Sequence, residues 1–172
     1  MSDQRLRRTR SPRSRVTLGR CGPLPPSFAA PRPRRPALAS SVLAPVFFIG
    51  GTLVAQALWP EFDPVRQTIS ELAAGDAPTR VFMTIMLALT GLCHLVTSVY
   101  AVSVVRAGRI ALGLAGLATI AVAAFPLPSV VGSSTAHTLS AMAGFVLLAI
   151  WPALVVAALA LRQRRDHRAS VS

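Results

Sequence analysis

The sequence has no lysine, only two cysteines and only six acidic residues among its 172 positions. Cys21 lies in an arginine-rich tail and Cys93 in a long apolar run, so the two thiols belong to different environments and we expect no disulfide between them. There is no CxxC pair of the kind found in small structural metal sites. These shortages exclude the disulfide-rich and zinc-knuckle classes of small protein.

Charge of one sign dominates the chain. All 18 basic residues are arginine and the formal net charge is +12, yet 52% of the residues are hydrophobic. Ten arginines fall within residues 5–35, while the hydrophobic residues concentrate after residue 40. One soluble core cannot hold both populations, so the chain must face two solvents. The exclusive use of arginine, with abundant Ala, Val, Gly and Pro, is typical of a GC-rich bacterial genome.

Residues 1–38 combine ten arginines with seven prolines and a single acidic residue, Asp3. Such a segment buries too little apolar surface to offset the entropy of ordering, so we predict a disordered cytoplasmic tail. Its arginines favour anionic lipid headgroups, at about 1 kcal/mol each near the surface. Phe28 is the only aromatic residue there for stacking on bases, so we do not expect a nucleic-acid partner. Whether all of this tail is translated stays open.

Four uncharged runs follow the tail, at about residues 39–58, 81–105, 110–127 and 136–161. A run of about 20 residues crosses roughly 30 Å of hydrocarbon as a helix. We therefore predict an all-α integral membrane bundle of four transmembrane helices, followed by a basic cytoplasmic tail at 162–172. One alternative stays open, because Arg34-Arg35 before the first run and Ala55-Gln56-Ala57 near its end could make that run a cleaved signal.

The placement of arginines predicts the orientation of the bundle. The N-terminal tail, residues 106–109 and the C-terminal tail hold ten, two and four arginines, whereas residues 60–80 and 126–135 hold two and none. By the positive-inside rule both termini are cytoplasmic, in a multi-pass protein of the plasma membrane. The loop at 60–80, which carries four of the six acidic residues, is then extracytoplasmic.

This loop is expected to contain a short amphipathic helix. Asp63-Pro64 is a good helix start, because aspartate caps free amide groups and proline is tolerated in the first turn. Gly75 supplies the stop. Between them Val65, Ile69 and Leu72 fall on one face at spacings of four and three residues. We predict that this helix lies on the outer surface or tucks onto the mouth of the bundle.

Small residues recur at helical spacing in the last two runs: Ala111, Ala115, Thr119 and Ala123, then Ala136, Ser140 and Gly144. Helices in lipid associate through close backbone approach, which small residues permit. The two stripes are candidates for helix contacts, although alanine is so frequent here that chance alignment is an equal explanation.

The loop and the later runs carry a recognisable pattern: Asp63-Pro64, then Arg66-Gln67-Thr68-Ile69-Ser70-Glu71-Leu72, a glycine, an apolar helix, Phe125-Pro126 and His137. Over residues 40–160 this resembles the bacterial multi-pass membrane family called domain of unknown function 998. Members often look like six-helix bundles with an acidic residue soon after Phe-Pro, whereas this chain supports four helices and has Leu127-Pro128 there. The resemblance implies a shortened member and a membrane architecture, and it implies no reaction.

His94 and His137 are the histidines that could carry chemistry, because an ionisable side chain in a membrane span is costly and often functional. At 1.5 Å per residue His94 lies about 20 Å below the outer face, and His137 only a few ångströms below it. Two axial haem ligands need one level, so we expect no haem. Zinc lacks a ligand set of diagnostic spacing, so we expect no metal or other cofactor. His94 alone is expected to be a neutral side chain bonded to a carbonyl, Thr90 or Ser98.

The residues at the outer mouth allow several functions. Our leading hypothesis is a non-enzymatic membrane component that binds lipid or a partner helix, or forms a homo-oligomer, through a polar surface of Asp63, Arg66, Ser70, Glu71 and His137. The alternative is a membrane-embedded hydrolase with Ser70 as nucleophile, His137 as base and Glu71 or Asp63 as orienting carboxylate. A transporter or channel subunit is a second alternative, although no charged residue lies within any predicted span and only His94 could relay a proton.

Overall fold

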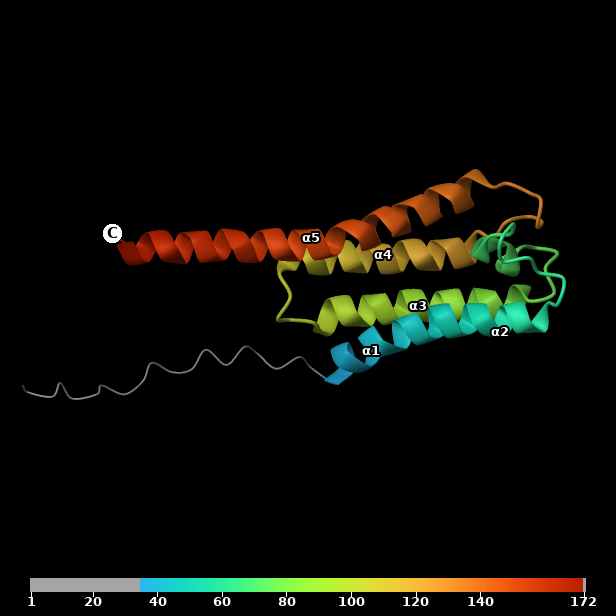
Figure 1. Cartoon of the computed structure of the whole chain (residues 1–172), viewed down its shortest axis with the longest axis horizontal. Helices are drawn as coiled ribbons and strands as arrows, with labels where there is room; N and C mark the ends of the chain where they lie inside the picture. The colour runs from blue at the N-terminus through green and yellow to red at the C-terminus, as the bar shows by residue number, and fades with distance from the viewer. Residues whose placement is uncertain (1–34, 172) are drawn as a thin grey trace, which may run out of the picture.

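The computed structural model describes residues 35–171, and the ordered elements of that part are all helical (Figure 1). In chain order they are α1 (Arg35–Pro45), the π-helix η1 (Val46–Gly50), α2 (Gly51–Leu58), the 3-10 helix η2 (Ile69–Ala73), α3 (Arg80–Tyr100), α4 (Arg106–Ala124) and α5 (Thr135–Val171). Because α1, η1 and α2 follow one another without a break, they act as one helix. The predicted disordered tail falls mostly on residues 1–34, which lie outside the described residues.

Four of these helices are long and apolar enough to cross a membrane: Arg35–Leu58, α3, α4 and α5. Their outward surfaces are apolar, with Leu53 61%, Leu117 53% and Phe145 69% exposed. Exposing such an apolar surface to water would be unfavourable, whereas contact with lipid tails is not. The predicted all-α bundle of four membrane-spanning helices is confirmed, and the chain is a multi-pass membrane protein.

The helices pack in chain order: α1 against α3, α3 against α4, and α4 against α5. Within residues 35–171, α1 and α5 share no extensive contact, so the bundle is open between its first and last helices. The chain ends of the described part and the 101–105 connection lie at one end, here called the arginine end, while residues 59–79 and 125–134 form the loop end (Figure 1).

The closest helix crossing joins α3 and α4 at two glycines. A methyl group on Gly91 would lie 2.7 Å from the Gly116 carbonyl oxygen, and one on Gly116 would lie 2.7 Å from the Gly91 carbonyl oxygen. The backbones therefore touch without intervening side chains, which is the packing mode expected in lipid. Of the predicted small-residue stripes, Ala111 and Ala115 are buried on α4, but Ala136 of the fourth span is exposed.

The first membrane helix widens into the π-helix η1 directly after Pro45. Proline has no N–H group to donate to the carbonyl four residues earlier, so the regular hydrogen-bond ladder is interrupted there. π-Helix is rare, occurs mostly as a single turn inside an α-helix, and often lies beside a functional site. Here the widened turn presents Phe48 and Ile49 to the open side of the bundle.

At the arginine end the helix bounds differ from those expected. The second helix ends at Tyr100 instead of Val105, and α4 begins at Arg106, inside the expected turn. The reason is Arg109, whose Nε donates to the Ser98 carbonyl at 2.7 Å and whose guanidinium also donates to the Val99 carbonyl at 2.7 Å. A cation that bonds the last free carbonyls of a helix stabilises its C-terminus.

The last helix does not stop at the arginines after Leu161. It continues to Val171, because residues 153–171 contain no glycine or proline and Arg, Gln and Ala favour helix. The basic C-terminal segment is thus a helical extension beyond the bundle (Figure 1). Pro152 lies within α5, which changes direction partway along, as expected where proline removes one helical hydrogen bond.

The predicted helix of the 60–80 loop is present only in its second half. Asp63 opens a turn in which its carbonyl accepts from the Arg66 and Gln67 amides, but Thr68 is extended, with φ −93° and ψ 156°. A separate 3-10 helix, η2, then begins at Ile69. The expected continuous apolar face is therefore broken. Val65 is 91% exposed, whereas Leu72 is fully buried.

Candidate functional site

The two loops of the loop end are fastened to each other. The Gly75 amide donates to the Leu127 carbonyl at 2.8 Å, and an Asp76 carboxylate oxygen accepts from the Val130 amide at 2.8 Å. A methyl group on residue 75 would come within 2.4 Å of the Pro128 carbonyl oxygen, so glycine is required for this approach. The Phe125-Pro126 segment and the acidic loop therefore form one lid over the bundle.

Helix η2 is part of this lid, and its apolar residues anchor it to the bundle. Leu72 packs in a core cluster that includes Ala55, Phe62 and Met83. The Thr79 hydroxyl donates to the Leu72 carbonyl at 2.8 Å in a buried hydrogen bond. The helix is thus tucked onto the mouth of the bundle, and its first two residues, Ile69 and Ser70, reach the open side.

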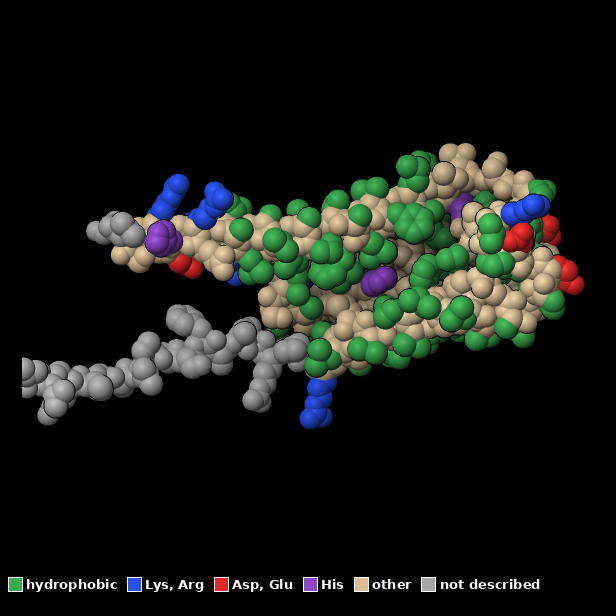
Figure 2. Space-filling model, viewed as in Figure 1, with side chains coloured by type: hydrophobic (Ala, Val, Ile, Leu, Met, Phe, Trp, Pro, Cys, Tyr) green, Lys and Arg blue, Asp and Glu red, His purple; other side chains and the backbone are tan. Residues whose placement is uncertain are grey.

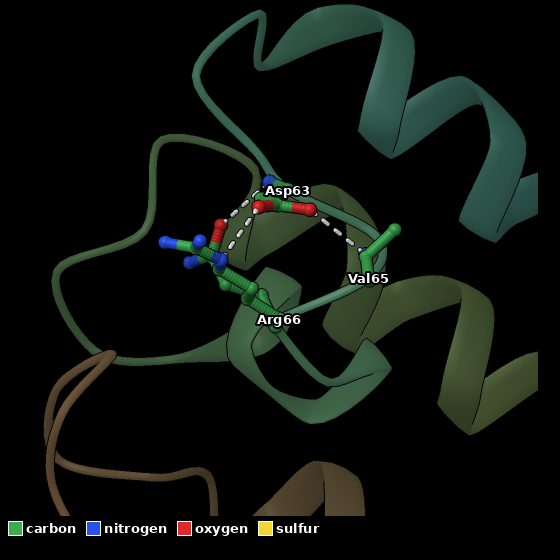
Figure 3. A network of polar contacts seen from close by, with 4 residues as sticks. Asp63, Val65 and Arg66 are labelled. Carbon is green, nitrogen blue, oxygen red and sulfur yellow. Dashed lines mark hydrogen bonds and ion pairs between the residues drawn. The ribbon is translucent and has the colours of Figure 1, made fainter.

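The charged members of the predicted polar surface serve local turn structure. Asp63 accepts from the Val65 amide at 2.9 Å and lies 3.7 Å from the Arg66 Nε (Figure 3). Glu71 accepts from both the Thr68 amide at 3.1 Å and the Thr68 hydroxyl at 3.0 Å. The Arg66 side chain is 87% exposed, so its ion pair contributes little to stability.

His137 is buried beneath the loops, with 4% of its surface exposed. Its Nδ1 lies 2.9 Å from the Phe125 carbonyl oxygen. A carbonyl can only accept, so this contact assigns the proton of the neutral ring to Nδ1 and leaves Nε2 as an acceptor. Nε2 is buried and has no hydrogen-bond partner among residues 35–171.

Ser70, Glu71 and His137 are not joined by hydrogen bonds. Within residues 35–171, Ser70 makes no side-chain hydrogen bond, Glu71 is bonded to Thr68, and His137 to Phe125. The nucleophile–base contact that a hydrolase needs is not formed between these residues. The hydrolase hypothesis gains no support from this geometry and stays a prediction.

A cleft of about 420 Å³ lies on the open side of the bundle, between the first helix and α5. Figure 2 shows a hollow between the helices in which a histidine side chain (purple) is visible. The cleft is lined by residues of α1, η1, η2, α3, α4 and α5: Ala44, Pro45, Phe48, Ile49, Ile69, Ser70, Leu87, Thr90, His94, Thr119, Val122, Ala141, Gly144, Phe145 and Leu148. Its lining is apolar except for Ser70, Thr90, His94 and Thr119.

His94 is the histidine of this cleft, and the hydrogen bond expected for it is not made. The Thr90 hydroxyl donates to the Met86 carbonyl at 2.8 Å, and the Ser98 hydroxyl donates to the Leu95 carbonyl at 2.8 Å. Both hydroxyls are satisfied within α3, so they are not available as donors to the ring. The Nδ1 atom of His94 is buried and has no hydrogen-bond partner in the part of the chain that the structure describes.

The cleft was not predicted from the sequence, although part of its signal is present there. Leu87, Thr90 and His94 follow one another at spacings of three and four residues, so they lie on one face of α3. Polar side chains on one face of an otherwise apolar span indicate a surface that does not face lipid tails alone. The contributions of η2 and α5 depend on the tertiary arrangement.

The described residues 35–171 contain no group of three or more His, Cys, Asp or Glu side chains that could hold a metal ion. The Cys93 thiol is free and buried in α3.

Comparison with known proteins gave one finding. Residues 42–172, which include α2 to α5 and the whole loop end, match the family described as "Protein of unknown function (DUF998)". Neither the curated proteins nor the solved structures gave a significant match. A four-span membrane bundle with this loop end and this cleft is therefore seen in a chain that belongs to the DUF998 family.

Proposed function

We propose that this protein is a non-enzymatic component of the bacterial plasma membrane that binds a lipid in the cleft between its first helix and α5. The observation that carries the proposal is the cleft itself, which opens sideways between two helices that do not pack on each other. A lateral opening gives a lipid direct access from the bilayer.

The orientation follows from the charges at the two ends. The arginine end carries Arg106 and Arg109 together with the α5 extension, whose basic residues are Arg162, Arg164, Arg165 and Arg168. The loop end has Arg66 and Arg80 beside four acidic residues. The positive-inside rule then places both termini in the cytoplasm and the loop end outside. Anionic headgroups of the inner leaflet are the expected partners of the basic extension.

The dimensions of the cleft favour a lipid chain over a partner helix. Its lining runs from Ser70 at the loop end to His94, which is 14 residues into α3 and so about 20 Å along it. A partner helix is about 10 Å across with its side chains. The cleft of about 420 Å³ lies within the usual size range of small-ligand pockets, so it suits a narrow apolar chain.

The outer polar residues would then line the approach to the cleft. Ser70 lines its outer part, and Asp63 and Arg66 are exposed on the same loop. The buried Leu72 and its hydrogen bond from Thr79 fix the position of η2, whose residues Ile69 and Ser70 line the loop end of the cleft.

Filling the cleft provides a test. Ala141 lines it from α5, so Ala141→Phe is expected to reduce the lipid retained by the purified protein at least about fivefold, because the ring takes up a large part of the volume. Ala143→Phe is the matched control, since Ala143 is exposed on the same helix and does not line the cleft. Lipid released from native membranes together with each variant would be measured by mass spectrometry.

Equal lipid retention by the two phenylalanine variants would contradict the proposal. Capture of a second copy of the chain or of another membrane protein, lost in Ala141→Phe but kept in Ala143→Phe, would favour a partner helix in its place.

A further inference from the structure

Resting on the proposed function, we propose that the cleft selects a lipid with one apolar chain and a small uncharged oxygen-bearing head, such as a quinone ring or a primary alcohol, and that the head binds at His94. The chain then follows the cleft toward Ser70. This orientation sets the head inside the membrane and not at its surface.

Apolar contact alone cannot give the cleft selectivity. A lipid chain that moves from the bilayer into the cleft exchanges one apolar environment for another, so hydrophobic transfer contributes almost nothing. Selection must come from the polar atoms of the lining, because only these interact differently with the cleft ligand and with ordinary lipid tails. Apart from Ser70 at the loop end, the polar lining residues are Thr90, His94 and Thr119.

His94 has unused hydrogen-bonding capacity. Its Nδ1 is buried without a partner, and a neutral imidazole carries one N–H donor and one acceptor nitrogen. An unpaired polar group is costly in hydrocarbon, where no bulk water is present to satisfy it. Because Nδ1 is buried, a ligand oxygen in the cleft would bond the other ring nitrogen, Nε2, and so give the ring one of its two possible hydrogen bonds.

Two threonines that line the same cleft add acceptors. Thr90 donates to the Met86 carbonyl at 2.8 Å, and Thr119 donates to the Ala115 carbonyl at 2.9 Å, so each hydroxyl has used its only proton. Each oxygen retains a lone pair for a ligand hydroxyl. His94, Thr90 and Thr119 together therefore offer one N–H donor and several acceptor atoms. Such a set suits a ligand carbonyl or hydroxyl group.

A charged head does not fit this position. Among the described residues 35–171, no arginine and no acidic side chain lines the cleft, so neither a phosphate nor an ammonium group would find an opposite charge there. His94 is also six residues from the end of α3 at Tyr100, about 9 Å inside the helix end. Burying an unpaired charge at that depth is strongly unfavourable. An ordinary phospholipid could insert a tail, but its methyl end would leave His94 unpaired.

The test uses the full-length protein in nanodiscs and three probes with one linear isoprenoid tail: a benzoquinone, a primary alcohol and a phosphate monoester. Native mass spectrometry would measure binding to wild type, to His94→Leu and to His94→Gln. We expect the two uncharged probes to bind at least tenfold more tightly than the phosphate ester. His94→Leu should weaken both about five- to tenfold, the worth of one hydrogen bond, and His94→Gln should restore part of the loss.

The outcomes separate this inference from the proposed function. Equal binding of all three probes, unchanged in His94→Leu but lost in Ala141→Phe, would overturn the selection at His94 and leave lipid binding in the cleft intact. Binding of no probe to wild type, with copurified lipid unchanged in Ala141→Phe, would overturn both.

Discussion

Replacing Gly116 with alanine is expected to lower the free energy of unfolding by about 1–3 kcal/mol, because the α3–α4 crossing has no room for a methyl group. The added carbon would lie 2.7 Å from the Gly91 carbonyl oxygen and 3.1 Å from the His94 Cβ, so backbone has to move. Gly116→Leu should prevent recovery of folded protein. Denaturant-induced unfolding in detergent micelles, followed by circular dichroism, measures the effect.

Gly50→Ala is the matched control for this substitution. Gly50 also lies in a membrane helix, but a methyl group there has no heavy atom within 4 Å. We expect no loss of stability, since alanine is the better helix former. Equal destabilisation by Gly50→Ala and Gly116→Ala would show that the two helices do not meet at their glycines.

Leu72→Ala is expected to cost about 2–5 kcal/mol, the range for removing a fully buried leucine side chain. Leu72 fixes η2 to the core cluster with Phe62 and Met83, so its loss should also loosen the loop end. Hydrogen exchange of the residue 68–80 amides should then rise more than that of α4. Unfolding experiments under the same conditions would give the energy.

Val65→Ala serves as the control, because Val65 lies in the same loop and is 91% exposed. Its effect on unfolding should stay within about 0.5 kcal/mol. If Leu72→Ala were as mild as Val65→Ala, η2 would not be part of the core.

Much of the fold could be predicted from the sequence because lipid imposes one strong rule. A run of about 20 uncharged residues has few alternatives to a membrane helix, and four such runs gave four helices. Helix ends were harder. The end of α3 at Tyr100 depends on a side chain from the next helix, Arg109, which no local pattern in α3 reveals.

The predicted amphipathic helix shows how local hydrogen bonds override periodicity. Val65, Ile69 and Leu72 have helical spacing, yet Thr68 is extended, and both its amide and its hydroxyl bond to Glu71. Threonine competes for backbone groups in this way and starts helices more readily than it continues them. The first apolar residue is therefore exposed and the last one buried.

The candidate site could be predicted only in part. His94 was recognisable as a polar side chain in an apolar span, and its face of α3 could be derived from helical spacing. The missing hydrogen-bond partner of the His94 Nδ1 atom could not be predicted, because it depends on how η1 and α5 pack around the cleft. The outer residues have the chemical types of a polar binding surface, but Asp63 and Glu71 bond to their own loop.

The proposals for the cleft depend on the threading of the chain through the membrane, and the charges at its two ends predict that the arginine end is cytoplasmic. Single cysteines at Val65 and Ser103, both exposed, would report on the two ends once Cys21 and Cys93 are replaced by alanine. A membrane-impermeant maleimide applied to intact cells should label Val65→Cys and should reach Ser103→Cys only after permeabilisation. Labelling of Ser103→Cys in intact cells, with Val65→Cys protected, would contradict the orientation, and equal labelling of both would contradict the membrane-spanning arrangement.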